Sequence, residues 1–478
     1  MKFKSILYSK KWAQVAAAFM IVVLAGVGVF AKTNNIPVVG QTPPQQPITL
    51  QGKGIGSQLV ISQTKVLQGS DGEVYLKLTL TPDAQLSGLA SERKPTDFVV
   101  VLDRSGSMSE KNKMDYAHKA IESLLAQMKS DDRFTLVTFD NVVETPVRQE
   151  FVSKGAMNKI MAQVHTVTPR GGTNLAEGLL QGVQFLKGAT TDGNRVKRLI
   201  MISDGNANIG ITNPSEIGQM AKNVASGEFA ISTIGVGLDY NEQIMANIAD
   251  YGMGNYHFLD KISDMDKILA GEFLGASQVV AQNLAMQINL NGVELVDASG
   301  YPIEKNGTNY TFKPGHLYAN QTKVVYLTLK VPTQKLGEYS LGVANLSYRI
   351  QDQDYVLPLM QNSYSVACLP AEKNEEVVAS IDKEAYGEAW QKNNYGGMLK
   401  TNASSLGRGD TKGAMQQIQD FKQKLQNAMK VAPSPAMEKQ MDELEAVEKD
   451  VQAAENSPDD QKYLGKKYYS EGTGSQRK

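Results

Sequence analysis

The chain has 478 residues, of which 41% are hydrophobic and 21% are charged, and its formal net charge is -1. This length is too great for one compact core, so we expect two to four folded domains. The balanced charge, without a basic stripe interleaved with aromatic residues, argues against a nucleic-acid partner. The single cysteine, Cys368, excludes an internal disulfide and a cysteine-based metal cluster.

The N-terminus combines positive charge with an apolar stretch. An apolar segment from Ala13 to Ala31 follows four lysines, Lys2, Lys4, Lys10 and Lys11. Positive charge ahead of such a segment keeps the N-terminus in the cytoplasm and sends the following chain across the membrane. Residues 1–31 are therefore predicted to be a cleaved signal peptide or an uncleaved membrane anchor. In both cases we expect an extracytoplasmic protein, membrane-anchored by this segment or secreted or periplasmic after cleavage.

The next part of the chain changes from a linker to strands. Residues 32–47 are rich in proline and glutamine, which predicts an extended spacer. Residues 48–94 contain the strand-like runs QLVISQT and EVYLKLTLT, and the second run alternates as a half-buried strand does. Because no other strand-rich segment is near them in the sequence, we expect these strands to pair with strands much later in the chain.

Strands alternate with helices between residues 95 and 275. The run FVVVLD, residues 98–103, is apolar up to its final aspartate, which is typical of a parallel strand covered on both faces. Similar strands, RFTLVTFD, RLIMIS and FAISTIGVG, follow with helical segments between them. This alternation predicts an α/β domain built on an open, doubly wound, Rossmann-like parallel sheet.

The chain then returns to strands and ends in helices. Residues 276–370 read as strands separated by Gly, Asn and Pro, which predicts an antiparallel β-sandwich-like domain that includes residues 48–94. The α/β domain would then be inserted in this sandwich or flanked by it. Residues 371–460 are predicted to be helical, because apolar residues recur at helical spacing. The polar tail, residues 461–478, is predicted to be disordered.

Three loops at one edge of the predicted α/β sheet carry oxygen side chains. Asp103, Ser105 and Ser107 follow the first strand, Thr173 begins a helix after two glycines, and Asp204 follows RLIMIS. Because ligands of doubly wound sheets bind beyond the carboxyl ends of the strands, we expect these five residues to meet there. Hydroxyl and carboxylate oxygens suit a hard cation, and we favour Mg2+ over the alternatives Mn2+ and Ca2+.

The five residues carry a family resemblance. The order D-x-S-x-S, then Thr, then Asp resembles the metal-ion-dependent adhesion site (MIDAS) of the von Willebrand factor type A (VWA) domain family, here of the bacterial, extracytoplasmic type, over about residues 95–275. More loosely, the flanking strands are similar to bacterial surface proteins and to inter-alpha-trypsin-inhibitor-heavy-chain-like proteins. The resemblance implies that Ser105 and Ser107 bind the ion directly, that the contact of Thr173 depends on conformation, and that Asp103 and Asp204 act through water. It also implies that an Asp or Glu of a partner protein completes the coordination.

These observations predict a non-enzymatic, metal-dependent protein-binding or adhesion protein at the cell envelope. The alternative is a non-catalytic subunit of a membrane-associated complex that regulates a partner ATPase, chelatase or channel. A hydrolase with a metal-activated water is a third hypothesis, but the sequence offers no obvious general base beside the site. Arg104, which stands between the candidate ligands, is predicted to be solvated rather than to steer an acidic partner. The sequence does not define the oligomeric state.

Overall fold

The structure is a computed structural model that describes residues 47–477, except for 90–93, 189–194, 225–228, 239, 260, 262–267, 274, 276–277, 352 and 362–363. The predictions for residues 1–31 and for the linker up to residue 46 lie outside the described residues. Among the helices that are described, none combines the length and the apolar composition needed to cross a membrane.

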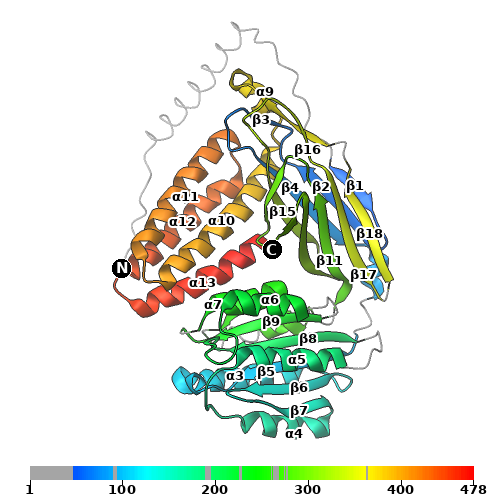
Figure 1. The fold of residues 1–478 in the computed structure, drawn as a ribbon, viewed down its shortest axis with the longest axis vertical. Helices are drawn as coiled ribbons and strands as arrows, with labels where there is room; N and C mark the ends of the chain where they lie inside the picture. The colour runs from blue at the N-terminus through cyan, green and yellow to red at the C-terminus, as the bar shows by residue number, and fades with distance from the viewer. Residues whose placement is uncertain are drawn as a thin grey trace, which may run out of the picture. The chain divides into compact units, whose positions relative to one another are not determined.

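The α/β domain is built on a six-stranded sheet with the strand order β10-β9-β8-β5-β6-β7 (Figure 1). All neighbouring strands are parallel except β6 and β7 at one edge. The order runs outward from β5 in both directions, so the topological switch point lies between β5 and β8. The prediction of a doubly wound sheet is confirmed. The strands are β5 (Thr96–Asp103), β6 (Arg133–Phe139), β7 (Val143–Phe151), β8 (Val196–Ser203), β9 (Phe229–Val236) and β10 (Met253–Leu259).

Helices cover both faces of this sheet, which explains why its strands are apolar throughout. Successive side chains of a strand point to opposite faces. In β5, Val100 and Leu102 pack in the core under α3 and α4, whereas Val99 and Val101 pack under the helices of the other face. The helices are α3 (Lys113–Gln127) and α4 (Lys154–His165) on one face, and α5 (Leu175–Gly188), α6 (Pro214–Val224) and α7 (Glu242–Tyr251) on the other.

A β-sandwich surrounds the insertion point of the α/β domain. Its two five-stranded antiparallel sheets, β1-β2-β4-β15-β12 and β13-β14-β11-β17-β18, share one core. Strand β4, which precedes the α/β domain, pairs with β15, which follows it, from Glu73–Lys330 to Leu80–Lys323. The α/β domain is therefore inserted in the sandwich. The strands are β1 (Ile48–Gln51), β2 (Ile55–Ile61), β4 (Glu73–Pro82), β11 (Val279–Asn289), β12 (Glu294–Ala298), β13 (Glu304–Asn306), β14 (Asn309–Tyr318), β15 (Lys323–Lys330), β17 (Val343–Ile350) and β18 (Gln353–Met360).

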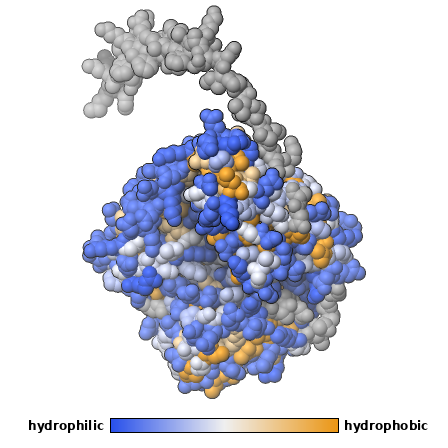
Figure 2. All heavy atoms as spheres, turned by 45° about the horizontal axis from the view of Figure 1, so that its top comes forward, coloured by the Kyte–Doolittle hydropathy of each residue, from blue (hydrophilic) through white to orange (hydrophobic). Residues whose placement is uncertain are grey.

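Smaller elements connect these layers. A three-stranded sheet joins β16 (Gly337–Ser340), β19 (Ser365–Leu369) and β3 (Lys65–Leu67). Short helices are α2 (Ala84–Leu89) and α9 (Asn374–Ala379), and two 3-10 helices are η1 (Gly106–Asn112) and η2 (Ala371–Lys373). On the face seen in Figure 2 the surface is mostly hydrophilic, with apolar side chains gathered in small patches.

Four long helices end the described chain and lie side by side in Figure 1. They are α10 (Lys383–Gly407), α11 (Thr411–Val431), α12 (Pro435–Ala453) and α13 (Pro458–Arg477). The prediction of a disordered tail is wrong for residues 461–477, which lie in α13. The physical reason is packing: Leu464 and Tyr468 are buried, and a Cβ atom on Gly472 would stand 2.7 Å from the carbonyl oxygen of Gly396 in α10. Glycines that suggested disorder thus allow two helices to approach closely.

Candidate functional site

The two predicted aspartates lie side by side at the carboxyl edge of the α/β sheet. Asp103 is the last residue of β5, and Asp204 directly follows Ser203, the last residue of β8. Since β5 and β8 are neighbouring parallel strands, their ends bring the two carboxylates to the same place, at the topological switch point. Both side chains are fully buried.

Backbone hydrogen bonds join the three loops that carry the predicted residues. The amide of Gly106 donates to the carbonyl of Gly171 at 3.0 Å, which links the loop after β5 to the loop before α5. The amide of Thr173 donates to Oδ1 of Asn208 at 2.8 Å, and the amide of Asn208 donates to the carbonyl of Thr173 at 3.1 Å. Thr173 is therefore fixed through its backbone against the loop of Asp204.

The two serine hydroxyls form the most compact part of the site. The Oγ atoms of Ser105 and Ser107 are 3.0 Å apart. Neighbouring ligands of an octahedral Mg2+, each at ~2.1 Å from the ion, are about 2.9 Å apart. Ser105 is buried and Ser107 is half-buried, so the pair reaches from the interior toward the surface. The spacing and chemistry of these oxygens fit a small hard cation.

Asp103 is held in place by several donors in a low-dielectric setting. Its Oδ1 accepts the amide of Ser105 at 2.8 Å, and its Oδ2 accepts the hydroxyl of Ser203 at 2.6 Å. Burial, and then the charge of Asp204, raises the pKa of Asp103 to about 7. Two buried carboxylates so close together repel each other, and a bound cation would relieve that repulsion.

Sequence reasoning missed two residues of this site. The hydroxyl of Ser203 donates to Asp103 and accepts the amide of Gly205 at 2.7 Å. In the sequence, the only signal for this role was the position of Ser203 directly before Asp204. Lys113 is 1% exposed, and its Nζ lies 3.3 Å from Oδ2 of Asp204. Its aliphatic stem lies against Gly237, where an added Cβ would be 2.9 Å from the lysine Cε. No local pattern distinguishes Lys113 from a surface lysine, because its role depends on tertiary contacts.

The prediction that Arg104 is solvated is wrong. Its side chain is buried and ion-paired, so it is not free to steer a partner either. It is 6% exposed, with its Nε 3.1 Å from Oδ2 of Asp140 and its Nη1 2.9 Å from Oε2 of Glu144. Arg170 contacts the same two carboxylates, each at 2.7 Å. The amide of Arg104 also donates to the carbonyl of Phe139, the last residue of β6. These contacts turn Arg104 inward, so it ties the loop after β5 to β6 and β7.

Among the described residues, no group of three or more His, Cys, Asp or Glu side chains could hold a metal ion. A cation at this edge would therefore depend on the hydroxyls of Ser105, Ser107 and Thr173 together with the two aspartates. A set of hydroxyl and carboxylate oxygens suits a hard divalent cation better than a softer transition metal.

The α/β domain is similar to a known family and to known proteins. Residues 97–270 match the family model of the von Willebrand factor type A domain. A 210-residue segment, 42% of this chain, is 30% identical to the Escherichia coli K12 protein YfbK and covers 36% of it. A 217-residue segment, 44% of this chain, is 27% identical to inter-alpha-trypsin inhibitor heavy chain H3 from Rattus norvegicus and covers 24% of it. The chain thus spans about a third or less of the length of these two relatives.

Two solved structures resemble nearly the whole described chain. A von Willebrand factor type A protein from Catenulispora acidiphila is 15% identical with a TM-score of 0.60, covering 85% of this chain and 91% of its own. The ArnB paralog VWA2 from Sulfolobus acidocaldarius is 17% identical with a TM-score of 0.52, covering 88% of this chain and 99% of its own. At these identities the likeness establishes the fold. The match to a family whose domains commonly mediate protein–protein interactions supports a protein-binding role.

Proposed function

We propose that this protein, whose residues 97–270 form a von Willebrand factor type A domain, is a non-enzymatic binding protein that captures a partner protein through a divalent cation. The observation that carries the proposal is the convergence of Ser105 and Ser107, with hydroxyls 3.0 Å apart, on two fully buried aspartates at the sheet edge. The proposed direct ligands are neutral serine hydroxyls, so they would leave much of the positive charge of the cation unneutralised.

The residues of the chain take separate roles in this proposal. Ser105 and Ser107 would bind Mg2+ directly, and Thr173 would join them in one conformation of its loop. Asp103 and Asp204 would accept hydrogen bonds from bound water and so orient it. When bound, Mg2+ supplies an exchangeable coordination position that an Asp or Glu side chain of a partner protein can take.

We place the binding domain outside the cytoplasm. The support is the order of charge and hydropathy at the N-terminus, where four lysines precede the apolar segment Ala13–Ala31. This segment would anchor the protein in the membrane if it is retained. Protease accessibility of the α/β domain in intact cells tests the topology, and protection of the domain until the membrane is permeabilised would contradict it.

Metal binding is tested first by calorimetric titration of the full-length chain with MgCl2. We expect Ser107→Ala to weaken Mg2+ binding at least ~10-fold, because it removes a direct ligand. Ser109→Ala is the matched control in the same loop, since Ser109 is exposed and its hydroxyl donates to the carbonyl of Gly106. Equal affinities for the wild type and Ser107→Ala would overturn the metal site.

Partner capture is tested by pull-down from envelope extract with the full-length chain. We expect one or more proteins to be retained in Mg2+ and lost in EDTA or with Asp204→Ala in Mg2+. Ser109→Ala should retain the same proteins. If the same proteins bind under all conditions, the metal site is not the binding surface.

A further inference from the structure

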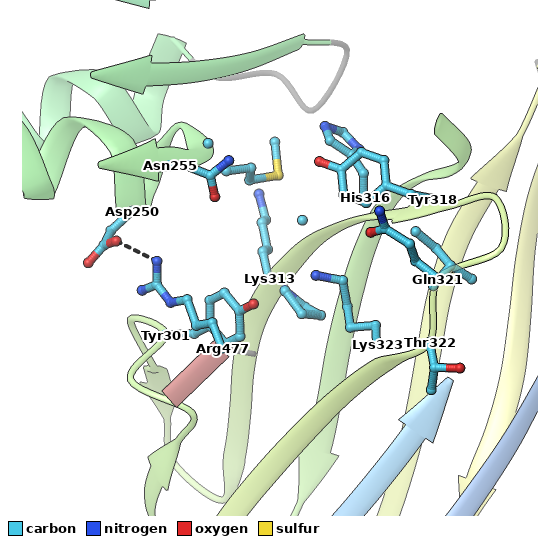
Figure 3. A pocket seen from close by; sticks show the side chains of 15 residues that line it. Asp250, Asn255, Tyr301, Lys313, His316, Tyr318, Gln321, Thr322, Lys323 and Arg477 are labelled. Atoms are coloured by element: carbon cyan, nitrogen blue, oxygen red, sulfur yellow. Dashed lines mark hydrogen bonds and ion pairs between the residues drawn. The ribbon is translucent and has the colours of Figure 1, made fainter. Parts of the chain in front are cut away.

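A cavity of about 440 Å³ lies at the opposite edge of the α/β sheet from Asp103. Figure 3 shows its lining, which comes from the start of β10, from β14 and the start of β15 in the sandwich, and from the end of α13. Strand β10 begins at Met253 and runs parallel to β9, so this cavity lies at the amino edge of the sheet. A strand of this length spans about 20 Å. The cavity and the proposed Mg2+ site are therefore separated by about the length of a strand.

The cavity lining carries an excess of positive charge. Lys313, Lys323 and Arg477 line it, together with one carboxylate, that of Asp250. Asp250 is already engaged, because its Oδ1 accepts Nη1 of Arg477 at 2.8 Å. Neither lysine has an ion-pair partner in the described part of the chain. In Figure 3 both lysine side chains extend into the same space.

Arg477 brings a fixed positive charge to this cavity. Its Nη2 donates to the carbonyl of Gly300 at 3.0 Å, and its guanidinium lies 4.4 Å from the ring centroid of Tyr301. These contacts and the ion pair with Asp250 fix the plane of the guanidinium. Its Nε is buried without a hydrogen-bond partner. Because this Nε is closed to solvent, Arg477 contributes its positive charge to the cavity rather than a free N–H group.

His316 is a neutral donor on the cavity lining. Its burial, and then the charges of Arg198 and Lys323, lower the pKa of His316 to about 3, so the imidazole is neutral at physiological pH. Its Nδ1 accepts the amide of Asn283 at 3.4 Å. The proton of the neutral ring therefore lies on Nε2, which makes this nitrogen a hydrogen-bond donor.

A second cavity of about 530 Å³ shares part of this lining and adds the buried residues Arg198 and Glu272. The shared residues are Asn255, Tyr318, Gln321 and Arg477. Arg198 lines the second cavity and is 2% exposed, and its Nε and Nη1 have no hydrogen-bond partner. Its nearest recorded carboxylate oxygen, on Glu272, is 4.0 Å from Nη1. Glu272 lines the same cavity and is 1% exposed, so its carboxylate offsets the charge of Arg198 and the second cavity adds no net positive charge.

We propose that the cavity lined by Lys313, Lys323 and Arg477 binds a small oxyanion, namely the phosphate or carboxylate group of a small molecule. Two flexible ammonium groups and the fixed positive charge of a guanidinium suit an anion with several oxygens. A cation would meet repulsion from the lining. The volume lies within the range typical of small-molecule sites, which favours a small ligand over a macromolecular one.

The test is calorimetric titration of the full-length, EDTA-treated protein, so that Mg2+ does not contribute. The probes are sodium pyrophosphate, sodium citrate and sodium chloride at matched ionic strength. We expect saturable binding of pyrophosphate, citrate or both, and none of chloride. The double variant Lys313→Met, Lys323→Met should bind at least tenfold more weakly. The matched control is Lys335→Met, an exposed lysine of the same sandwich that does not line the cavity.

The outcomes separate the ligand classes. Saturation by pyrophosphate alone assigns a phosphate ligand, and saturation by citrate alone assigns a carboxylate ligand. Absence of saturation by both probes overturns the proposal. Unchanged affinity in the double variant, with wild-type circular dichroism, also overturns it. Lys323→Arg conserves the charge and should retain binding even if the methionine variant is unstable.

Discussion

At the scale of single residues, Lys113 supplies a buried positive charge to two buried aspartates. Its ammonium lies 3.3 Å from Asp204, and both side chains are almost completely buried. We expect Lys113→Met to lower the free energy of unfolding by about 3–5 kcal/mol in EDTA, because it leaves buried carboxylates uncompensated. The loss should be smaller in saturating Mg2+, since the bound cation restores positive charge. Urea unfolding under the two conditions measures the difference.

The control for this change is Lys119→Met, an exposed lysine of the same helix α3. It should alter stability by less than about 0.5 kcal/mol in either buffer. An equal loss for Lys113→Met with and without Mg2+ would contradict the charge argument. It would indicate that Lys113 acts through packing against Gly237 instead.

The residues of this site differ in how far the sequence reveals them. Asp103 and Asp204 each follow a run of buried aliphatic residues, so the rule for doubly wound sheets places them together before any coordinates are known. Ser203 and Lys113 gain their roles from contacts between segments about 90 to 100 residues apart, as in the Lys113–Asp204 and Ser203–Asp103 pairs. Arg104 was predicted to be solvated because arginine is common at protein surfaces, yet its ion pairs with Asp140 and Glu144 bury it.

At the scale of elements, the contact between α10 and α13 depends on glycine. A Cβ atom on Gly472 would lie 2.7 Å from a backbone carbonyl oxygen of Gly396, which cannot move without shifting the helix. We expect Gly472→Ala to destabilise the protein by about 1–3 kcal/mol through overpacking. Gly474→Ala in the same helix is the control, because a Cβ there meets nothing within 4 Å. Its higher helix propensity should stabilise the protein by about 0.5–1 kcal/mol.

Thermal unfolding of the two variants distinguishes packing from propensity. If both alanines raise the melting temperature, then the close approach of α10 and α13 does not limit stability.

The same contact explains why the composition of residues 461–477 led to the wrong prediction of a disordered tail. Lysine, serine and glycine are typical of disordered tails, but the apolar anchors Leu464 and Tyr468 and the glycine contact specify a packed helix that only the partner α10 makes evident.

At the scale of the whole molecule, the two proposed sites differ in which parts of the chain they need. All the buried hydrophobic residues in the two cores of the α/β domain come from residues 98–269. The five residues of the proposed Mg2+ site lie in the same segment. The oxyanion cavity instead takes Lys313 and Lys323 from the sandwich and Arg477 from α13. The proposed oxyanion site would therefore need the α/β domain, the sandwich and α13 together.

This division predicts the behaviour of the isolated segment 94–277. We expect it to fold, because its cores are self-contained, and to bind Mg2+ within about threefold of the full-length affinity, because no candidate ligand is lost. It should not bind pyrophosphate or citrate, since both cavity lysines are absent. Calorimetry on the segment, with circular dichroism to verify folding, measures both affinities. A folded segment that still binds pyrophosphate as the full chain does would place the anion site on the α/β domain, near Arg198. A folded segment without Mg2+ affinity would instead mean that the sandwich or helices hold the loops around Asp103 and Asp204 in their binding arrangement.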